Sequence, residues 1–164
     1  MYDNYYEEGF GQNKSQILDL ENFELIARKY KWNYQRFFSS LPKNVRILDV
    51  GCGLGQFLFY LRKEGFQHLT GIDISQSQVD LALQMQPKVD FRRIEDTCRF
   101  LNQRQGRYDV ITLNDVTEHL ELEDNILLLK AIHNALNQGG KIIIKTVNAA
   151  FPLGSSTRYA DLTH

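Results

Sequence analysis

The feature that most constrains the fold is a regular alternation of short apolar runs with segments of helical periodicity. The apolar runs are expected to be buried strands over residues 45–50, 68–72, 89–94, 108–113 and 141–147. Between them, apolar residues recur every three or four positions, which is the spacing of amphipathic helices. Strands that are apolar on both faces and alternate with helices predict an α/β fold. Its doubly wound, mostly parallel sheet would be the middle of a three-layer α/β/α sandwich.

Capping residues and stop signals set the expected helix boundaries. The helices are expected over residues 20–40, 56–63, 75–84, 97–103 and 122–136. Pro42 stops the first of them, and Ser75 can cap the third. Gly139-Gly140 is expected to end the last one, because glycine readily adopts the left-handed conformation that closes a helix.

Composition excludes several classes of protein. The chain has 164 residues, which is enough for one domain and one core, and its formal net charge is −1, so no global field attracts nucleic acid. No apolar run approaches the roughly 20 residues that span a bilayer, and the acidic start is unlike a secretory signal. Cys52 and Cys98 form no paired motif, so we expect a reducing, cytoplasmic setting.

A glycine-rich loop follows the first expected strand, in the segment Asp49-Val50-Gly51-Cys52-Gly53-Leu54-Gly55. Its glycines permit a tight turn and a close approach of ligand to backbone, and the next helix directs free N–H groups at that ligand. Asp73 follows the second expected strand and lies 22 residues beyond Gly51. An acidic residue at about this distance accepts hydrogen bonds from ribose hydroxyls in nucleoside-binding folds.

Two cofactor classes compete for this loop. Dinucleotide-binding loops have the pattern GxGxxG, whereas Gln56 stands here at the position of the third glycine. Asp49 would also repel a diphosphate. S-adenosylmethionine has no phosphate and carries an ammonium and a sulfonium, so a carboxylate beside the loop suits it. The loop therefore favours S-adenosylmethionine over NAD, and an NAD-dependent oxidoreductase is the less favoured alternative.

The chain resembles the class I S-adenosylmethionine-dependent methyltransferases over about residues 40–164. The motifs that carry the resemblance are residues 47–55, 71–75, 108–111 and 113–120, together with Gly139-Gly140. The resemblance implies strand order 3-2-1-4-5 and binding roles for Asp49, Gly51, Cys52, Gly53, Gly55, Asp73, Ile74, Asp96, Thr97 and Asn114. It places the glycine loop and Asn114 at the amino-acid end of the cofactor, and Cys52 would contact the cofactor only through its backbone. Asp73 would bind the ribose, and Ile74, Asp96 and Thr97 would lie near the adenine. For Asp73 and Asp96, capping of the following helix is the alternative role.

Asp115 and His119, in the expected mouth of the site, are the candidate catalytic residues. His119 could act as a general base for a hydroxyl acceptor, or could pack behind Glu118 at the start of a helix. The run Asp115-x-x-Glu118-His119 also resembles the metal-ligand run of RNA ribose methyltransferases, in which His164 could complete a site. We expect no metal, because the same spacing is common in metal-free methyltransferases.

A narrower resemblance concerns bacterial methyltransferases encoded with cell-surface polysaccharide genes. Residues 2–6, 71–79 and 158–164 carry it, and it implies O-methylation of a small-molecule hydroxyl, such as that of a sugar or nucleotide sugar. We expect one domain with an irregular arm (1–16), a helix (20–40), a cofactor-binding core (44–150) and the start of a substrate-side segment (151–164). A complete class I domain continues into an antiparallel hairpin, so truncation is expected. The alternatives are a non-catalytic cofactor-binding fragment and an RNA ribose methyltransferase.

Overall fold

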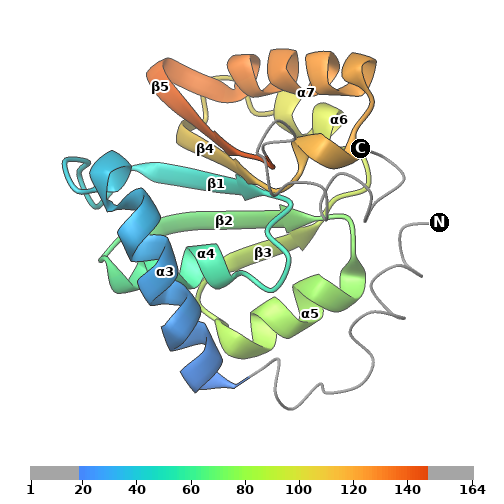
Figure 1. Cartoon of the computed structure of the whole chain (residues 1–164). Coiled ribbons are helices and arrows are strands. Elements are labelled where there is room, and N and C mark those ends of the chain that lie inside the picture. The colour runs from blue at the N-terminus through green and yellow to red at the C-terminus, as the bar shows by residue number, and fades with distance from the viewer. Residues whose placement is uncertain (1–18, 148–164) are drawn as a thin grey trace.

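The computed structural model describes residues 19–147, which form an α/β structure around one parallel sheet (Figure 1). The expected arm (1–16), the segment 151–164 and His164 lie outside the described residues. The strands are β1 (Arg46–Val50), β2 (His68–Asp73), β3 (Asp90–Arg93), β4 (Tyr108–Asn114) and β5 (Leu136–Lys145). The helices are α3 (Leu20–Phe38), α4 (Gln56–Lys63), α5 (Gln76–Met85), α6 (Thr97–Asn102), α7 (Leu122–Ala135) and the short 3₁₀ helix η1 (Thr117–His119).

The sheet has the order β3-β2-β1-β4-β5 and every neighbouring pair is parallel, which confirms the expected doubly wound topology. Helices α3, α4 and α5 cover one face, whereas α6 and α7 cover the other (Figure 1). A hydrophobic core lies on each side of the sheet, so the predicted three-layer sandwich is also confirmed. None of the helices within residues 19–147 combines the length and apolar character that crossing a bilayer requires.

Helix α3 forms where the apolar spacing predicted it. Asp19 caps its first turn by accepting a hydrogen bond of 3.1 Å from the backbone N–H of Glu21. The helix buries a stripe of side chains against α4 and the sheet: Phe23, Ala27, Tyr34 and Phe38. The ring of Phe38 meets Phe57 of α4 edge-on and that of Tyr34 meets it at a tilt, so α3 is held by an aromatic cluster as well as by buried area. The helix ends at Phe38, slightly before the expected residue 40.

The boundary between α7 and β5 was predicted wrongly. Helix α7 ends before Leu136, and β5 begins at that residue instead of at Lys141. Residues 137–140 bulge out of the ladder opposite Asp109 of β4. Gly139-Gly140 belongs to this bulge, in which Gly139 adopts a φ of 77°. The glycine pair therefore forms a bulge in the edge strand β5 and does not end helix α7.

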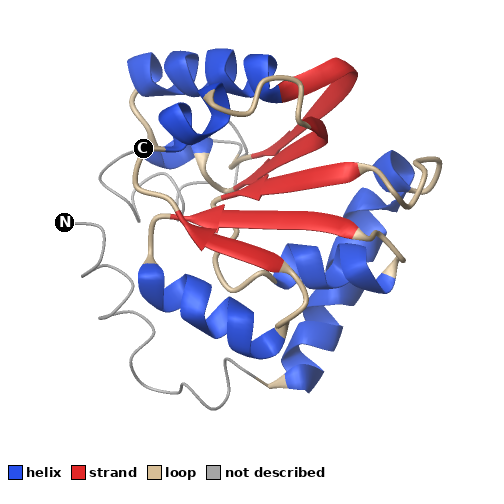
Figure 2. Ribbon diagram, turned by 180° about the vertical axis from the view of Figure 1, so that it is seen from behind, coloured by secondary structure: helices blue, strands red, loops and turns tan. Residues whose placement is uncertain are grey.

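The parallel topology brings three loops to one edge of the sheet. Val50 of β1 pairs with Ile72 of β2 and with Leu113 of β4, so the residues that follow these three strands lie side by side. Figure 2 shows the strands converging toward this edge. In open α/β sheets, ligands bind outside the carboxyl ends of the strands, where the strand order reverses. Here that reversal lies between β1 and β4, directly beside the glycine loop.

Candidate functional site

The glycine loop between β1 and α4 has a backbone that only glycine fits. Gly51 has a φ of 70°, and a Cβ atom on it would lie 2.5 Å from Cγ2 of Val116. Gly55 has a φ of 73°, and a Cβ atom there would lie 2.5 Å from Cζ of Phe91. Both residues are therefore fixed by conformation and by space. Gly55 is the N-cap residue of helix α4, so the first N–H groups of that helix open toward the loop.

Hydrogen bonds from two neighbouring segments hold the loop in place. The backbone N–H groups of Gly51 and Cys52 both donate to the carbonyl oxygen of Ile72 at the end of β2, at 2.9 and 3.0 Å. Behind the loop, Nε2 of the fully buried Gln86 donates to the carbonyl oxygen of Gly55 at 2.8 Å. Sequence reasoning missed Gln86, because a glutamine just before a proline reads only as a helix end.

Asp73 lies at the end of β2 and joins the glycine loop to helix α5. One carboxylate oxygen accepts the N–H of Gly53 at 2.8 Å, and the other accepts the N–H of Ser75 at 2.9 Å. The N-cap of α5 is Ser75, whereas Asp73 accepts the N–H of that cap residue. The capping role that was the alternative for Asp73 is therefore divided between the two residues. Each carboxylate oxygen keeps a free lone pair that a ligand hydroxyl could use. Ile74 follows with its side chain 46% exposed, which leaves an apolar surface beside this carboxylate.

Asp49 is the buried charge of the site. Its side chain is 2% exposed, and Oδ1 accepts hydrogen bonds from Oγ1 of Thr112 at 2.6 Å and from Nδ2 of Asn114 at 3.3 Å. Burial nevertheless raises the pKa of Asp49 from 3.8 to about 7, and the nearby Asp73 adds to that rise. No Lys or Arg within residues 19–147 forms an ion pair with Asp49. A cationic ligand group beside this carboxylate would offset the cost of its burial.

Cys52 in the loop and Asp96 after β3 each have a role in packing or capping. Cys52 is buried, and burial raises the pKa of its thiol well above the usual range, so it is not a reactive thiolate. Asp96 caps helix α6, accepting the backbone N–H of Arg99 at 2.8 Å. It is exposed, and Thr97 beside it is half-buried. Asp96 therefore has the helix-capping role that was the alternative for it, and its side chain remains exposed to solvent.

Asp115 and His119 follow β4 at the same edge of the sheet. Asp115 has a φ of 57°, which is uncommon for a residue with a side chain and is frequent at functional sites. Its carboxylate is ion-paired with Lys145 of β5, and Glu118 accepts a hydrogen bond of 3.1 Å from Oγ1 of Thr146. His119 ends η1 with its side chain half-buried. Both candidate catalytic residues thus lie in the segment that follows β4.

The metal alternative receives no support from this arrangement. Within residues 19–147, no group of three or more His, Cys, Asp or Glu side chains is placed to hold a metal ion. The Lys145 ammonium already neutralises Asp115, which makes that carboxylate a poor ligand for a divalent cation.

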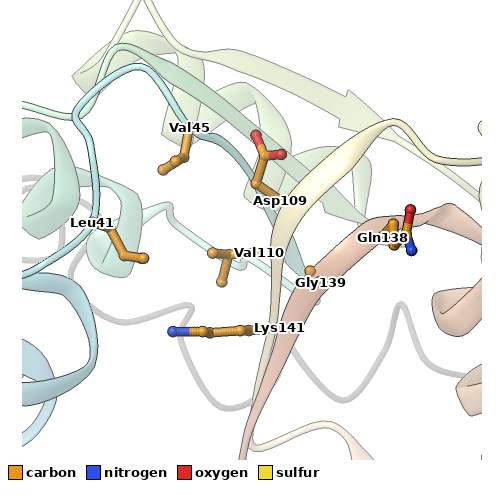
Figure 3. Close-up of a pocket in the computed structure, with 8 residues that line it drawn as sticks. Leu41, Val45, Asp109, Val110, Gln138, Gly139 and Lys141 are labelled. Atoms are coloured by element: carbon orange, nitrogen blue, oxygen red, sulfur yellow. The ribbon is translucent and has the colours of Figure 1, made fainter.

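A separate hollow lies at the opposite edge of the sheet (Figure 3). It has a volume of about 200 Å³ and is lined by Leu41, Val45, Asp109, Val110, Gln138, Gly139, Gly140 and Lys141. These residues stand at the amino ends of β1 and β4 and in the bulge of β5, so the hollow is unrelated to the glycine loop.

Comparison with known proteins shows the family to which the chain belongs. A family model described as a methyltransferase domain matches residues 23–163. The chain is 31% identical over 152 residues to a ubiquinone biosynthesis O-methyltransferase from Aeromonas salmonicida. The match covers 80% of this chain and 62% of that protein. It is 28% identical over 143 residues to phosphoethanolamine N-methyltransferase 1 from Arabidopsis thaliana, covering 85% of this chain and 26% of the relative. The chain thus spans between about a quarter and three fifths of these relatives.

Among solved structures, a SAM-dependent methyltransferase from Archaeoglobus fulgidus superposes with a TM-score of 0.73 at 23% identity. The match covers 99% of this chain and 66% of that one. The five-stranded parallel sheet in the order 3-2-1-4-5 is thus the fold of this class of protein. With a glycine loop after β1 and acidic residues in and after the neighbouring strands, the chain belongs to the methyltransferase-domain family and has the class I, Rossmann-like fold.

Proposed function

We propose that this chain binds S-adenosylmethionine at the carboxyl ends of β1, β2 and β4 and directs methyl transfer to a hydroxyl oxygen of a small acceptor. The observation that carries the proposal is the buried Asp49 carboxylate, which has no cationic partner within the described residues and lies beside the glycine loop. A carboxylate in that place favours a ligand with an ammonium group and disfavours a pyrophosphate. The membership of the chain in the methyltransferase-domain family gives independent support.

The described residues suit the parts of this cofactor. Asp49 and Asn114 would receive the ammonium end, with the backbone of Gly51, Cys52, Gly53 and Gly55 along the methionine part. Asp73 would accept the ribose hydroxyls, while Ile74 would pack on the adenine. Asp96 and Thr97 would lie at the adenine edge, where the exposed carboxylate of Asp96 can accept a hydrogen bond while it caps α6.

When bound, S-adenosylmethionine supplies a methyl group on a sulfonium, which is already activated toward a nucleophile. The chain contributes chiefly by holding donor and acceptor in line, and such positioning can supply about 7–11 kcal/mol of a barrier. A sugar hydroxyl remains protonated at neutral pH and benefits from a base. We assign that role to His119 and propose Asp115 as the second catalytic residue at the mouth of the site.

The acceptor that we propose is a sugar or nucleotide sugar. Its support is the resemblance to methyltransferases of polysaccharide biosynthesis, together with the similarity to an enzyme named as an O-methyltransferase. The thiols of Cys52 and Cys98 are free, which suits the reducing cytoplasm that we propose as the location.

Calorimetric titration of this chain with S-adenosylhomocysteine and, separately, with NAD tests the cofactor. We expect micromolar binding of S-adenosylhomocysteine and none of NAD, because Asp49 and Gln56 oppose a pyrophosphate in the loop. Acceptor screening with nucleotide sugars then follows on the same preparation. Binding of NAD without S-adenosylhomocysteine would overturn the proposal in favour of an oxidoreductase.

The His119→Ala variant tests the base. We expect kcat to fall by about 10²–10⁴, the usual contribution of general base catalysis, whereas the Kd for S-adenosylhomocysteine stays within about twofold. His133→Ala on α7 is the matched control and should leave both values unchanged. A fall of less than threefold in kcat for His119→Ala would mean that the proton leaves by another route.

A further inference from the structure

The residue that extends this site beyond the strand ends is Tyr34 of helix α3. Its side chain is 5% exposed, yet its hydroxyl emerges from the aromatic cluster and donates to Oδ1 of Asn114. These two residues are 80 positions apart in the sequence. Asn114 ends β4, so a helix on one face of the sheet reaches the edge at which the glycine loop lies.

The contact fixes the orientation of the Asn114 side chain. A carboxamide can present either its oxygen or its nitrogen, and the two arrangements differ only by a flip. Because the Tyr34 hydroxyl donates to Oδ1, the nitrogen Nδ2 turns toward Asp49 and donates to its Oδ1 at 3.3 Å. The flipped arrangement would set the carboxamide oxygen against an ionised carboxylate oxygen, which is repulsive.

The chain of hydrogen bonds ends on one oxygen of Asp49 only. Oγ1 of Thr112 donates to that same Oδ1 at 2.6 Å, while no donor within residues 19–147 reaches Oδ2. The carboxylate is therefore held by two donors on one oxygen, and the other oxygen remains for a ligand. Buried networks of this kind act as a unit, so the loss of the outermost donor affects the innermost acceptor.

We propose that Tyr34 is a positioning residue for the cofactor. It acts through Asn114 to orient Asp49 toward the ammonium of the amino-acid end of S-adenosylmethionine. This inference rests on the proposed function, because it assumes the cofactor placement given above. Helix α3 lies outside the loops that follow the strands, yet through Tyr34 it would set the affinity for the amino-acid end of the ligand. The adenosine end, at Asp73 and Ile74, should be independent of it.

The test compares Tyr34→Phe with a matched control, Tyr30→Phe. Tyr30 lies one turn earlier on α3 in the same aromatic cluster, and within the described residues its hydroxyl makes no hydrogen bond. Both variants keep the ring and lose only the hydroxyl. We expect Tyr34→Phe to raise the Kd for S-adenosylhomocysteine by about fivefold or more, and Tyr30→Phe to change it by less than twofold. Thermal melts should show that both variants are folded.

A second ligand separates positioning from packing. 5′-Methylthioadenosine lacks the amino-acid end, so its affinity should change by less than twofold in Tyr34→Phe. An unchanged Kd for S-adenosylhomocysteine in Tyr34→Phe would overturn the inference, and so would an equal loss of affinity for both ligands or in both variants. If the parent chain bound no S-adenosylhomocysteine at all, the proposed function itself would fail, and that result is distinct from these.

Discussion

The Asp49→Asn variant is expected to be more stable than the parent chain at pH 8 and, at the same pH, to bind S-adenosylhomocysteine at least tenfold more weakly. Burial raises the pKa of Asp49 from 3.8 to about 7. The folded chain therefore holds this proton more tightly than the unfolded chain does. For such a group, stability is greatest below the unfolded pKa and is lost as the pH rises from about 4 to about 7. At pH 8 the folded chain bears the full cost of a buried carboxylate.

The size of the effect follows from the shift. Roughly three pKa units at about 1.4 kcal/mol each correspond to about 4 kcal/mol. Asparagine has the same shape and remains neutral, so it avoids this cost but not that of burying an amide. We expect a gain of about 1–4 kcal/mol in the free energy of unfolding. For a chain of this length, each kcal/mol raises Tm by about 2–4 °C.

The same substitution, Asp49→Asn, should lower the affinity for the cofactor. The carboxylate can form a charge-assisted hydrogen bond with an ammonium, and such bonds contribute about 1.5–3 kcal/mol. An amide cannot replace this interaction. In the parent chain, affinity should also fall as the pH drops below about 7, because protonation of Asp49 competes with ligand binding. In Asp49→Asn this component of the pH dependence should be absent.

Melting curves and calorimetric titrations at pH 5 and pH 8 check both effects. The difference in stability between the variant and the parent should shrink at pH 5, where Asp49 is protonated in the folded chain. A variant that is less stable than the parent at pH 8 would show that the hydrogen bonds from Thr112 and Asn114 outweigh the cost of burial. The carboxylate would then be a structural anchor instead of a site kept for a cation.

The sequence predicted the order of the elements because each strand and each helix has its own local signal. Apolar runs, capping residues and glycines after strands act over a few positions, and the parallel order follows from their alternation. The error at Gly139-Gly140 has the same origin. A positive φ suits both a helix end and a bulge, and only the pairing of β5 with β4 distinguishes the two.

The residues that support the site could not be predicted in this way. Gln86, Thr112 and Tyr34 each act on a partner that is 31, 63 or 80 positions away. In the sequence they read as a helix end, a strand residue and one of several aromatic residues on a helix. The packing of α3 and α5 against the sheet reveals the contacts of Tyr34 and Gln86, and the pairing of β4 with β1 reveals that of Thr112. The residues that we propose to face the ligand come from motifs instead, and these motifs lie directly at the strand ends.

The second large effect is expected for Asp73→Ala, which should raise the Kd for S-adenosylhomocysteine by at least tenfold. The substitution removes both acceptors for the ribose hydroxyls, and hydrogen bonds to a charged group contribute about 1.5–3 kcal/mol each. It also frees the N–H groups of Gly53 and Ser75, which the carboxylate holds at 2.8 and 2.9 Å. The glycine loop should therefore lose order as well as a ligand contact.

Asp80→Ala is the matched control, because Asp80 is an exposed aspartate on α5 whose carboxylate accepts a hydrogen bond only from Gln76 within the described residues. Its Kd should stay within about twofold of the parent value. The ligand 5′-methylthioadenosine, which keeps the ribose, should lose affinity in Asp73→Ala as strongly as S-adenosylhomocysteine does. If Asp73→Ala bound both ligands as tightly as the parent chain, the ribose would lie elsewhere and the carboxylate would serve only to join the loop to α5. A loss confined to S-adenosylhomocysteine would instead mean that Asp73 faces the amino-acid end, which would reverse the orientation of the cofactor across the sheet.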